Sequence, residues 1–400
     1  MSVNEPLRPL QSLRSFEPVE LGSRVDAVLD QTLHDQRLVG AVVLVAHRGK
    51  LIYNRAAGLA DREAQLPMRE DALFLLSSVS KPITSVAALV LVAKGKIRLD
   101  DDISQWLPYF KPTLGDGQPA TITVRQLLSH TAGLTYGFLE SDQGGPYRYA
   151  GVSDGLDRSD ISLEENLRRL SQAPLLYKPG SGWGYSIATD VLGALIAAVN
   201  GTSLAEAIDE LIAQPLTWRD TSFSVSEVGR LSLAYLNGLP QPRRMNELEV
   251  IPVFEGTAGI RLQPARALDP QAYNSGGSGL VGTAGEFLQL LETLRKGGEP
   301  LLPKALVDEM GSNQTGEREL DNWPGRGFGL GFTVLKDPAA AQTAESAGSW
   351  RLGGAYGHSW FVDPAEQLTV VAFTNTAFEG MFGQFTVDLC NAVYGLESES

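Results

Sequence analysis

The most constraining feature of this 400-residue chain is a short polar stretch that leads directly into a long apolar run. Residues 75–82 read Leu-Leu-Ser-Ser-Val-Ser-Lys-Pro, and the apolar run occupies residues 83–93. Residues three apart on a helix share a face, so we expect the hydroxyl of Ser78 to meet the ammonium of Lys81 there.

This pairing indicates nucleophilic catalysis by a serine. A serine hydroxyl is a weak nucleophile until a neighbouring group takes its proton. A desolvated lysine can take that proton itself, or it can hold another base in its charged form. A Ser-x-x-Lys tetrapeptide also occurs in helices that have no catalytic role. The assignment of Ser78 and Lys81 therefore depends on the rest of the chain.

Composition and charge restrict the class of protein. With 43% hydrophobic and 20% charged residues, the chain has the composition of an ordinary globular protein. The formal net charge of −14 argues against a nucleic acid or an anionic membrane as partner, because both require a basic face. The single cysteine, Cys390, excludes an intrachain disulfide, and we expect it to be a buried structural thiol.

The sequence predicts no targeting or membrane-spanning segment. Residues 1–20 contain prolines and charged side chains but no apolar core of the kind that a signal peptide needs. The run at residues 86–93 is far too short to span a bilayer. We therefore expect a cytoplasmic protein, and the sequence leaves its oligomeric state open.

Both ends of the chain predict strands and helices of one antiparallel sheet. We expect a hairpin of strands at residues 40–46 and 51–57 around the turn at residues 48–50, and two further strands at residues 354–362 and 368–375. Helices are expected at residues 23–37, with Ser23 as N-cap, and at residues 382–393. The economical arrangement is a sheet with both terminal helices on one face.

The middle of the chain has mostly helical periodicity with many Gly and Pro breaks. Helices are expected near residues 122–129, 163–170, 190–199, 204–212 and 285–295, and irregular surface at residues 230–269. We predict an α/β (α+β) protein with an N-terminal extension (1–20), an α/β lobe (21–75 and 326–400) and a mainly helical insertion (76–325). The Ser78 helix would lie at the junction of the two lobes.

Three separated motifs carry a family resemblance. They are Ser78-x-x-Lys81, Pro-Gly-Ser-Gly-Trp-Gly-Tyr-Ser at residues 179–186, and Gly-Gly-Ala-Tyr-Gly-His at residues 353–358. In this order they resemble the serine β-lactamase-like superfamily, which includes class C β-lactamases, D-alanyl-D-alanine peptidases, family VIII carboxylesterases and acyltransferases. The chain is most similar to family VIII carboxylesterases of the EstB type, from about residue 24 to residue 394. The resemblance implies the β-lactamase/transpeptidase-like fold, with the active site in the cleft between the lobes.

The resemblance also implies a role for each motif. Ser78 would be the nucleophile that accepts the acyl group, and Lys81 and Tyr185 would form its general base. A phenol is a poor base at neutral pH, but an adjacent lysine cation favours the phenolate. Which of the two groups takes the proton stays open, because the three groups titrate as a unit. The backbone N–H groups of Ser78 and Ala355 would form the oxyanion hole, on an edge strand that lines the cleft. No cofactor or metal is implied.

Two departures from the superfamily pattern concern the substrate. Lactamases and peptidases have Tyr-x-Asn where this chain has Ile187 in place of the Asn, and Leu352 stands where Lys, His or Trp begins the third motif. Both losses favour an uncharged ester in an apolar pocket. The substrate-binding residues implied by the resemblance are Tyr136, Trp183, Ile187, Leu352, Gly353, Gly354 and His358.

Other nucleophile assignments were weighed. Residues 151–155 read Gly-Val-Ser-Asp-Gly and match the Gly-x-Ser-x-Gly of α/β-hydrolases, but the flanking residues predict a loop rather than the strand and helix that this motif needs. Ser153 is therefore disfavoured as nucleophile. A Ser-His-Asp triad through His358 is an alternative of low weight. The four histidines show no metal-binding spacing.

The leading hypothesis is hydrolysis of short- to medium-chain carboxylic esters through an acyl-enzyme on Ser78. Alternatives are a β-lactamase or D-alanyl-D-alanine peptidase, and an acyltransferase that uses the same acyl-enzyme. A fourth, of another class, is a non-catalytic binding homologue. The expected partner is a small-molecule ester.

Overall fold

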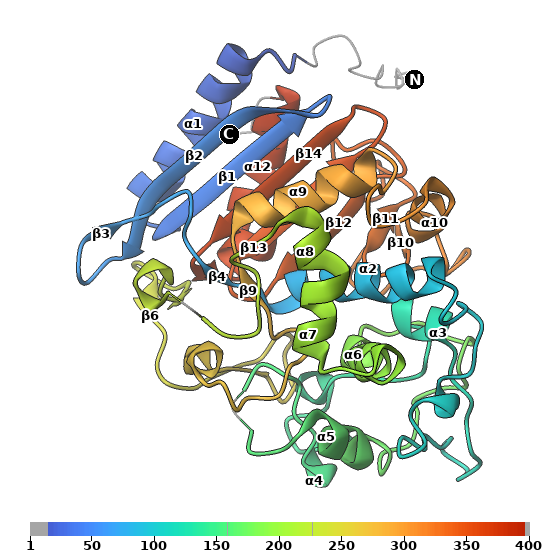
Figure 1. Cartoon of the computed structure of the whole chain (residues 1–400). Helices are drawn as coiled ribbons and strands as arrows, with labels where there is room; N and C mark the ends of the chain where they lie inside the picture. Colours follow the sequence, from blue (N-terminus) through green and yellow to red (C-terminus); the bar gives the residue numbers. More distant parts are fainter. Residues whose placement is uncertain (1–14, 158, 226, 397–400) are drawn as a thin grey trace, which may run out of the picture.

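The computed structural model describes residues 15–157, 159–225 and 227–396, so most of the expected N-terminal extension lies outside the described residues. The main sheet consists of β1 Gly40–His47, β2 Lys50–Asp61, β3 Leu66–Pro67, β10 Arg326–Phe328, β11 Thr333–Leu335, β12 Trp350–Gly354, β13 His358–Asp363 and β14 Leu368–Thr374. These eight strands are antiparallel in the order β10-β11-β12-β13-β14-β1-β2-β3 (Figure 1). The two ends of the chain therefore build one sheet, as expected.

Strand β1 is buried on both of its faces, which explains its continuous apolar sequence. Val43 and Val45 pack against the helices α1 (Pro18–His34) and α12 (Gln384–Tyr394), which lie together on one face of the sheet. Val42 and Leu44 join the larger core on the other face. The prediction that both terminal helices cover one face is confirmed.

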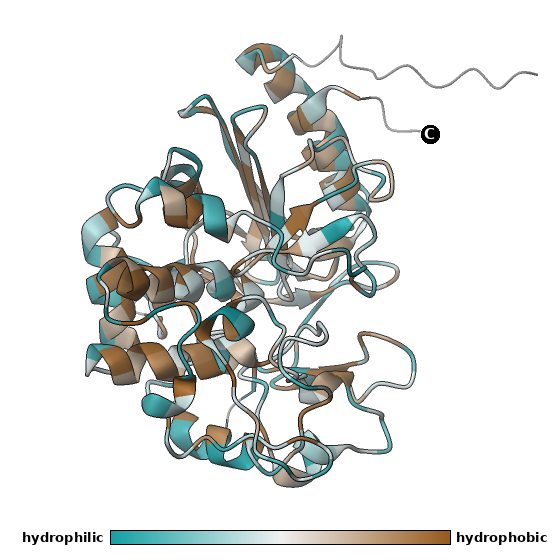
Figure 2. Ribbon diagram, turned by 90° about the vertical axis from the view of Figure 1, so that its right-hand side faces the viewer, coloured by the Kyte–Doolittle hydropathy of each residue, from teal (hydrophilic) through white to brown (hydrophobic). Residues whose placement is uncertain are grey.

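The opposite face of the sheet is covered by α9 (Ala284–Arg295), which crosses β1 and β14 (Figure 1). This helix lies inside the range expected for the helical insertion (76–325), yet its apolar side packs against the sheet. Figure 2 shows hydrophobic residues concentrated in the central helices and strands, with hydrophilic residues on the outer segments.

The rest of the inserted lobe is mainly helical. Its helices are α2 Ser80–Ala93, α3 Val124–Leu128, α4 Pro146–Ala150, α5 Leu163–Leu170, α6 Ala188–Asn200, α7 Leu204–Ile208, α8 Gln214–Leu216 and α10 Lys304–Met310, and α11 Glu379–Phe382 precedes α12. Short 3-10 turns are η1 Ser77–Val79, η2 Ile103–Gln105, η3 Gly137–Leu139, η5 Val228–Arg230 and η6 Pro264–Leu268, and a π turn, Asp209–Ala213, joins α7 to α8. Helix α6 ends where expected, because Gly201 at φ +75° provides the left-handed cap.

Two local expectations were wrong. Helix α1 begins at Pro18, whose fixed φ suits a first turn, so Ser23 lies inside the helix and its hydroxyl donates to Val19 O. The strand expected at residues 354–362 is two strands, β12 and β13, separated by a turn in which Gly357 has φ +112°.

Residues 230–269 are mostly irregular, as expected, but they also contain four short strands: β5 Tyr235–Leu236, β6 Arg243–Arg244, β7 Glu249–Ile251 and β8 Ile260–Leu262. Strand β5 pairs with β15 (Thr376–Ala377), and β4 (Phe74–Leu75) pairs with β9 (Val281–Gly282). Strands this short depend on partners distant in sequence, so local composition does not reveal them.

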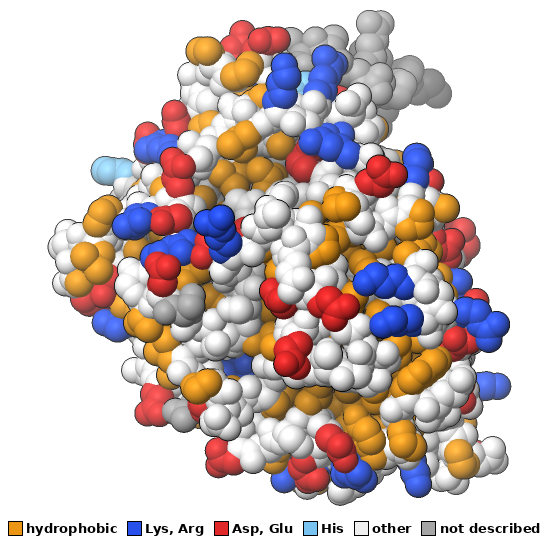
Figure 3. All heavy atoms as spheres, in the orientation of Figure 1, with side chains coloured by type: hydrophobic (Ala, Val, Ile, Leu, Met, Phe, Trp, Pro, Cys, Tyr) orange, Lys and Arg blue, Asp and Glu red, His pale blue; other side chains and the backbone are white. Residues whose placement is uncertain are grey.

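Acidic and basic side chains are interspersed on the face shown in Figure 3. Among the described residues, no single helix has both the length and the apolar composition needed to cross a membrane. One bent pair, Ala188–Asn200 with Leu204–Leu216, meets those two criteria only jointly.

Candidate active site

The pair Ser78 and Lys81 lies where β4 passes into α2. Ser78 occupies the 3-10 turn η1 directly before α2, and Lys81 is the second residue of that helix. Twelve of the 14 residues of α2 are buried, and the helix packs against α6 and α7. The ammonium of Lys81 is fully buried, and its Nζ donates to Ser78 Oγ at 3.1 Å.

A second polar group reaches the same hydroxyl from another part of the chain. Tyr185 OH lies 2.8 Å from Ser78 Oγ. The loop that presents this tyrosine is fixed by backbone bonds from Gly180 N to Thr131 O and from Gly184 N to His130 O. The structure therefore brings together the three residues that the sequence assigned to catalysis, with Ser78 Oγ between a cation and a phenol.

Lys81 is surrounded by one carbonyl and two aromatic rings. Its Nζ donates to Gly277 O at 3.0 Å and lies 4.7 Å from the ring centroid of Tyr185 and 5.3 Å from that of Tyr136. Both ring distances are within the range of cation–π contacts. The predicted residue Tyr136 thus contacts the lysine side of the site.

His130 supports Tyr185 from behind. Its ring stacks on the Tyr185 ring at 5.1 Å, and its Nδ1 accepts from the Ser186 amide at 3.1 Å. Burial, and then the charge of Lys81, hold the pKa of His130 well below its usual value. Burial likewise holds the pKa of Tyr136 well above its ordinary value. Both side chains are therefore neutral supports at neutral pH.

The third motif approaches the nucleophile turn from the main sheet. Strand β12 lies between β11 and β13 rather than at the sheet edge, but β11 pairs only with Trp350 and Arg351. Within the described part of the chain, the end of β12 therefore has no strand partner on the β11 side. It lies close to the nucleophile turn, since a side chain at Gly354 would come within 2.6 Å of Leu76 O. Among the described residues, none accepts a hydrogen bond from the buried amide of Ala355, which follows directly.

Aromatic side chains also border Tyr185. The ring of Trp323 lies 5.5 Å from that of Tyr185 and 5.4 Å from that of the predicted residue Trp183. Phe328 stacks behind Trp323 at 6.5 Å. These rings form an apolar wall beside the reactive phenol.

Three predicted substrate-binding residues lie in the core. Ile187 and His358 are fully buried, and Leu352 is 6% exposed within the main core. His358 Nε2 bonds Leu75 O at 2.8 Å instead of the nucleophile, and burial lowers the pKa of this imidazole to about 4. The structure does not bring His358 to Ser78 as a triad base.

In the competing Gly-x-Ser-x-Gly stretch, Ser153 is hydrogen-bonded to neighbouring side chains. Ser153 is buried in a loop after α4, and its hydroxyl donates to Asp157 Oδ1 at 2.6 Å. Its backbone amide donates to Asn166 Oδ1.

Cys390 is buried as a free thiol, and burial raises its pKa to about 11. Among the described residues, no group of three or more His, Cys, Asp or Glu side chains is arranged to hold a metal ion.

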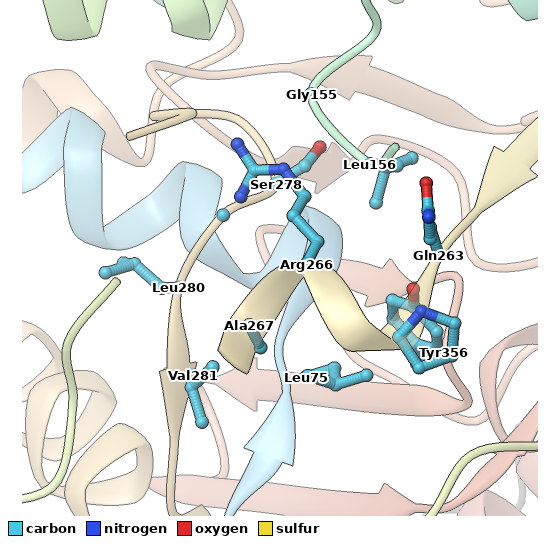
Figure 4. A pocket seen from close by; sticks show the side chains of 12 residues that line it. Leu75, Gly155, Leu156, Gln263, Arg266, Ala267, Ser278, Leu280, Val281 and Tyr356 are labelled. Carbon is cyan, nitrogen blue, oxygen red and sulfur yellow. The ribbon is translucent and has the colours of Figure 1, made fainter. Parts of the chain in front are cut away.

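A small, partly open pocket is lined by residues that flank the site in the chain (Figure 4). Its walls include residues next to the site in sequence: Leu75 before the nucleophile turn, Ser278 after Gly277, and Tyr356 after Ala355. The remaining lining residues are Gly155, Leu156, Gln263, Pro264, Arg266, Ala267, Gly279, Leu280 and Val281. Most of this surface is apolar.

Sequence reasoning missed three residues that complete the site: Gly277, Asp190 and Trp323. Gly277 lies in the stretch Asn-Ser-Gly-Gly-Ser-Gly at residues 274–279, whose glycine content was a usable signal. Asp190 was also visible, as a carboxylate in the first turn of a strongly apolar helix. No local pattern indicated Trp323.

The chain is similar to known proteins over most of its length. The family model described as Beta-lactamase matches residues 25–388. The chain is 49% identical to Esterase EstB of Burkholderia gladioli over 381 residues, which are 95% of this chain and 97% of that protein. Among solved structures, EstCE1, described as a hydrolase with promiscuous acyltransferase activity, superposes with a TM-score of 0.90 at 44% identity, covering 95% of this chain and all of that chain. The simvastatin synthase LovD from Aspergillus terreus shares the fold, with a TM-score of 0.73 at 22% identity over 94% of this chain and 98% of its own.

Proposed function

The chain belongs to the beta-lactamase family, and from that premise we propose that it is a serine carboxylesterase that forms an acyl-enzyme on Ser78. The observation that carries the proposal is the placement of Ser78 Oγ between Lys81 Nζ at 3.1 Å and Tyr185 OH at 2.8 Å. The similarity to Esterase EstB, at 49% identity, supports an ester as substrate.

In the first half-reaction, Ser78 Oγ attacks the ester carbonyl carbon and its proton passes to the Lys81/Tyr185 pair. The carbonyl oxygen becomes an oxyanion, which the backbone N–H groups of Ser78 and Ala355 stabilise. Collapse of this intermediate breaks the bond to the alcohol oxygen, and the leaving alkoxide takes the proton from the pair. Water then repeats the sequence on the acyl-enzyme and releases the acid.

We propose that the acyl chain contacts the apolar surface of the pocket of Figure 4, whose residues Leu75 and Tyr356 lie close in sequence to the nucleophile turn and to Ala355. The mostly apolar wall favours hydrocarbon chains of short to medium length. Leu352 and Ile187 offer no cation or amide to a substrate carboxylate or peptide. This disfavours a β-lactamase or a D-alanyl-D-alanine peptidase.

A second candidate function is acyl transfer to an alcohol or amine. It uses the same acyl-enzyme, and the description of EstCE1 as a hydrolase with promiscuous acyltransferase activity favours it as a side reaction. A non-catalytic role is disfavoured, because Ser78, Lys81 and Tyr185 are all present and in contact.

The test is steady-state hydrolysis of p-nitrophenyl acetate, butyrate and octanoate by the wild type, Ser78→Ala and Ser153→Ala, with a chromogenic cephalosporin read separately. Ester turnover that disappears in Ser78→Ala and survives in Ser153→Ala is expected. Absence of ester turnover in the wild type would overturn the proposal, and rapid cephalosporin opening in its place would make the protein a lactamase.

A further inference from the structure

The ammonium of Lys81 depends on a single backbone carbonyl for its position. Among the described residues, no carboxylate forms an ion pair with it. Apart from the nucleophile, its hydrogen-bond acceptor is Gly277 O. The rings of Tyr185 and Tyr136 lie beside it, and its charge acts on the Asp190 carboxyl without a direct ion pair. A buried ammonium is costly unless its N–H groups are paired, so the location of Gly277 O fixes where Nζ lies.

Asp190 holds that carbonyl in place. The Gly277 amide donates to Asp190 Oδ1 at 2.7 Å, and the Ser275 hydroxyl donates to the same oxygen at 2.7 Å. One carboxylate oxygen therefore anchors residues 275–277 from two sides. Thr84 Oγ1 on α2 adds a third anchor by donating to Gly276 O at 2.7 Å.

The anchored segment is packed tightly between the two charged groups. A Cβ atom at Gly277 would lie 3.1 Å from Asp190 Oδ1, 3.3 Å from Tyr136 OH and 3.6 Å from Lys81 Nζ. A side chain here would crowd the carboxylate and the phenol and would reach van der Waals contact with the ammonium, so the segment has little room to move.

Asp190 lies on α6 close to the apolar residue Ile187. It follows Ile187 by three residues, so the two positions are about one helical turn apart. The side chain at Ile187 is fully buried and apolar and has no hydrogen-bonding atom to offer to the lysine. Asp190 is 1% exposed, and burial raises the pKa of its carboxyl while its bonds to Ser275 and Gly277 oppose that rise.

We propose that Asp190 is a positioning residue for the reaction. It fixes Gly277 so that the Gly277 carbonyl aims the Lys81 ammonium at the Ser78 hydroxyl. Asp190 thereby supplies, one turn further along α6, the polar support for Lys81 that the apolar side chain of Ile187 does not provide. The inference rests on the proposed acyl-enzyme on Ser78.

The experiment compares Asp190→Ala and Asp190→Asn with the wild type. Asn retains an oxygen acceptor for the Gly277 amide, whereas Ala removes it. The matched control is Asp363→Ala, which removes another fully buried carboxylate that accepts from the Ser346 amide and the Tyr394 hydroxyl, away from the site. Active-site titration with p-nitrophenyl butyrate gives the number of competent sites, and stopped-flow measurement gives the acylation rate per site.

We expect Asp190→Ala to lower the acylation rate per site about 100-fold, as misplacement of a catalytic group by about 1 Å does. KM should change little, Asp190→Asn should recover most of the rate, and Asp363→Ala should lose thermal stability without a slower rate per site. A wild-type rate per site in Asp190→Ala overturns the inference, since a purely structural role lowers only the number of active sites. An Asp190→Asn variant as slow as Asp190→Ala overturns it as well.

If Asp190→Ala gives no folded protein, Asp190→Glu decides. The longer side chain displaces Gly277, so the rate per site should fall while the burst amplitude persists, and an unchanged rate contradicts the inference. A wild type that does not turn over the ester, or turnover that survives Ser78→Ala, is a failure of the proposed function itself. An intact wild-type burst with an unchanged Asp190→Ala rate is a failure of the Asp190 inference alone.

Discussion

At the scale of single residues, the proposed mechanism depends on how the protein positions the phenol of Tyr185. The ring of Tyr185 lies between the stacked imidazole of His130 and the edge of Trp323, so it has little freedom to turn. The Lys81 cation lies 4.7 Å from its centroid, within the range of a cation–π contact. The neutral state of His130 prevents a second positive charge from competing with that of Lys81.

Tyr185→Phe tests this arrangement, because it keeps the stacked ring and removes only the hydroxyl that contacts Ser78. We expect kcat/KM for p-nitrophenyl butyrate to fall about 100- to 10,000-fold, the contribution typical of general acid–base catalysis. The matched control is Tyr177→Phe, whose hydroxyl makes a long 3.4 Å bond to His130 O and should contribute little. Wild-type turnover by Tyr185→Phe would remove the phenol from the mechanism.

At the scale of secondary structure, the site depends on the close approach of β12 to the turn η1. Gly354 has no room for a side chain, since a Cβ atom would lie 2.6 Å from Leu76 O and 2.9 Å from Ser77 Oγ. The strand end therefore touches the two residues directly before the nucleophile. Any displacement there moves Ser78 relative to the Ala355 amide.

Gly354→Ala should therefore impair catalysis without touching a reacting group. We expect kcat to fall about 100-fold through misplacement of the nucleophile turn, with a lower melting temperature. Gly285→Ala is the control: it lies in α9 with nothing within 4 Å of the added Cβ, and it should stabilise the protein by up to about 1 kcal/mol. Steady-state kinetics and thermal melts on both variants check this, and a fully active Gly354→Ala would show that the contact is dispensable.

His358 on β13 gives the sheet a defined sensitivity to acid. Burial lowers its folded pKa to about 4, so the folded state keeps the imidazole neutral. Below its unfolded pKa of about 6.5, the unfolded chain binds a proton that the folded protein refuses, and stability falls as the pH falls. The loss should reach about 3 kcal/mol between about pH 6.5 and pH 4.

His358→Gln should remove that part of the pH dependence, since Gln has no titrating group and retains an amide donor for Leu75 O. Urea unfolding at several pH values measures the slope of stability against pH. His47→Gln, at a half-buried imidazole outside the core, is the control and should leave most of the slope unchanged. An unaltered slope in His358→Gln would mean that this histidine is not held neutral in the folded state.

At the scale of the whole molecule, the site is assembled from segments that lie far apart in the chain. The motif that contains Ser78 and Lys81, the loop that presents Tyr185 and the strand that ends at Gly354 each have a local sequence pattern. Those patterns, together with the resemblance, were sufficient to predict the fold, the one-sided packing of the terminal helices and the three residues that meet at the nucleophile.

The remaining features depend on contacts that local patterns do not encode. Gly277 O binds a lysine 196 residues earlier, and nothing in a glycine-rich loop specifies that partner. Helix α9 has an ordinary apolar face, and its sequence does not tell which surface that face covers. The division between β12 and β13 depends on a tight turn at Gly357, which a continuous apolar pattern conceals.

The central claim is that Ser78 carries the acyl group. The most direct measurement is mass-spectrometric localisation of the adduct formed with diethyl p-nitrophenyl phosphate, which phosphorylates an activated serine without rapid turnover. The account predicts one diethylphosphoryl group on the peptide that contains Ser78, loss of esterase activity in proportion to labelling, and no label in Ser78→Ala. A label on Ser153, or an esterase that the reagent neither labels nor inhibits, would contradict it.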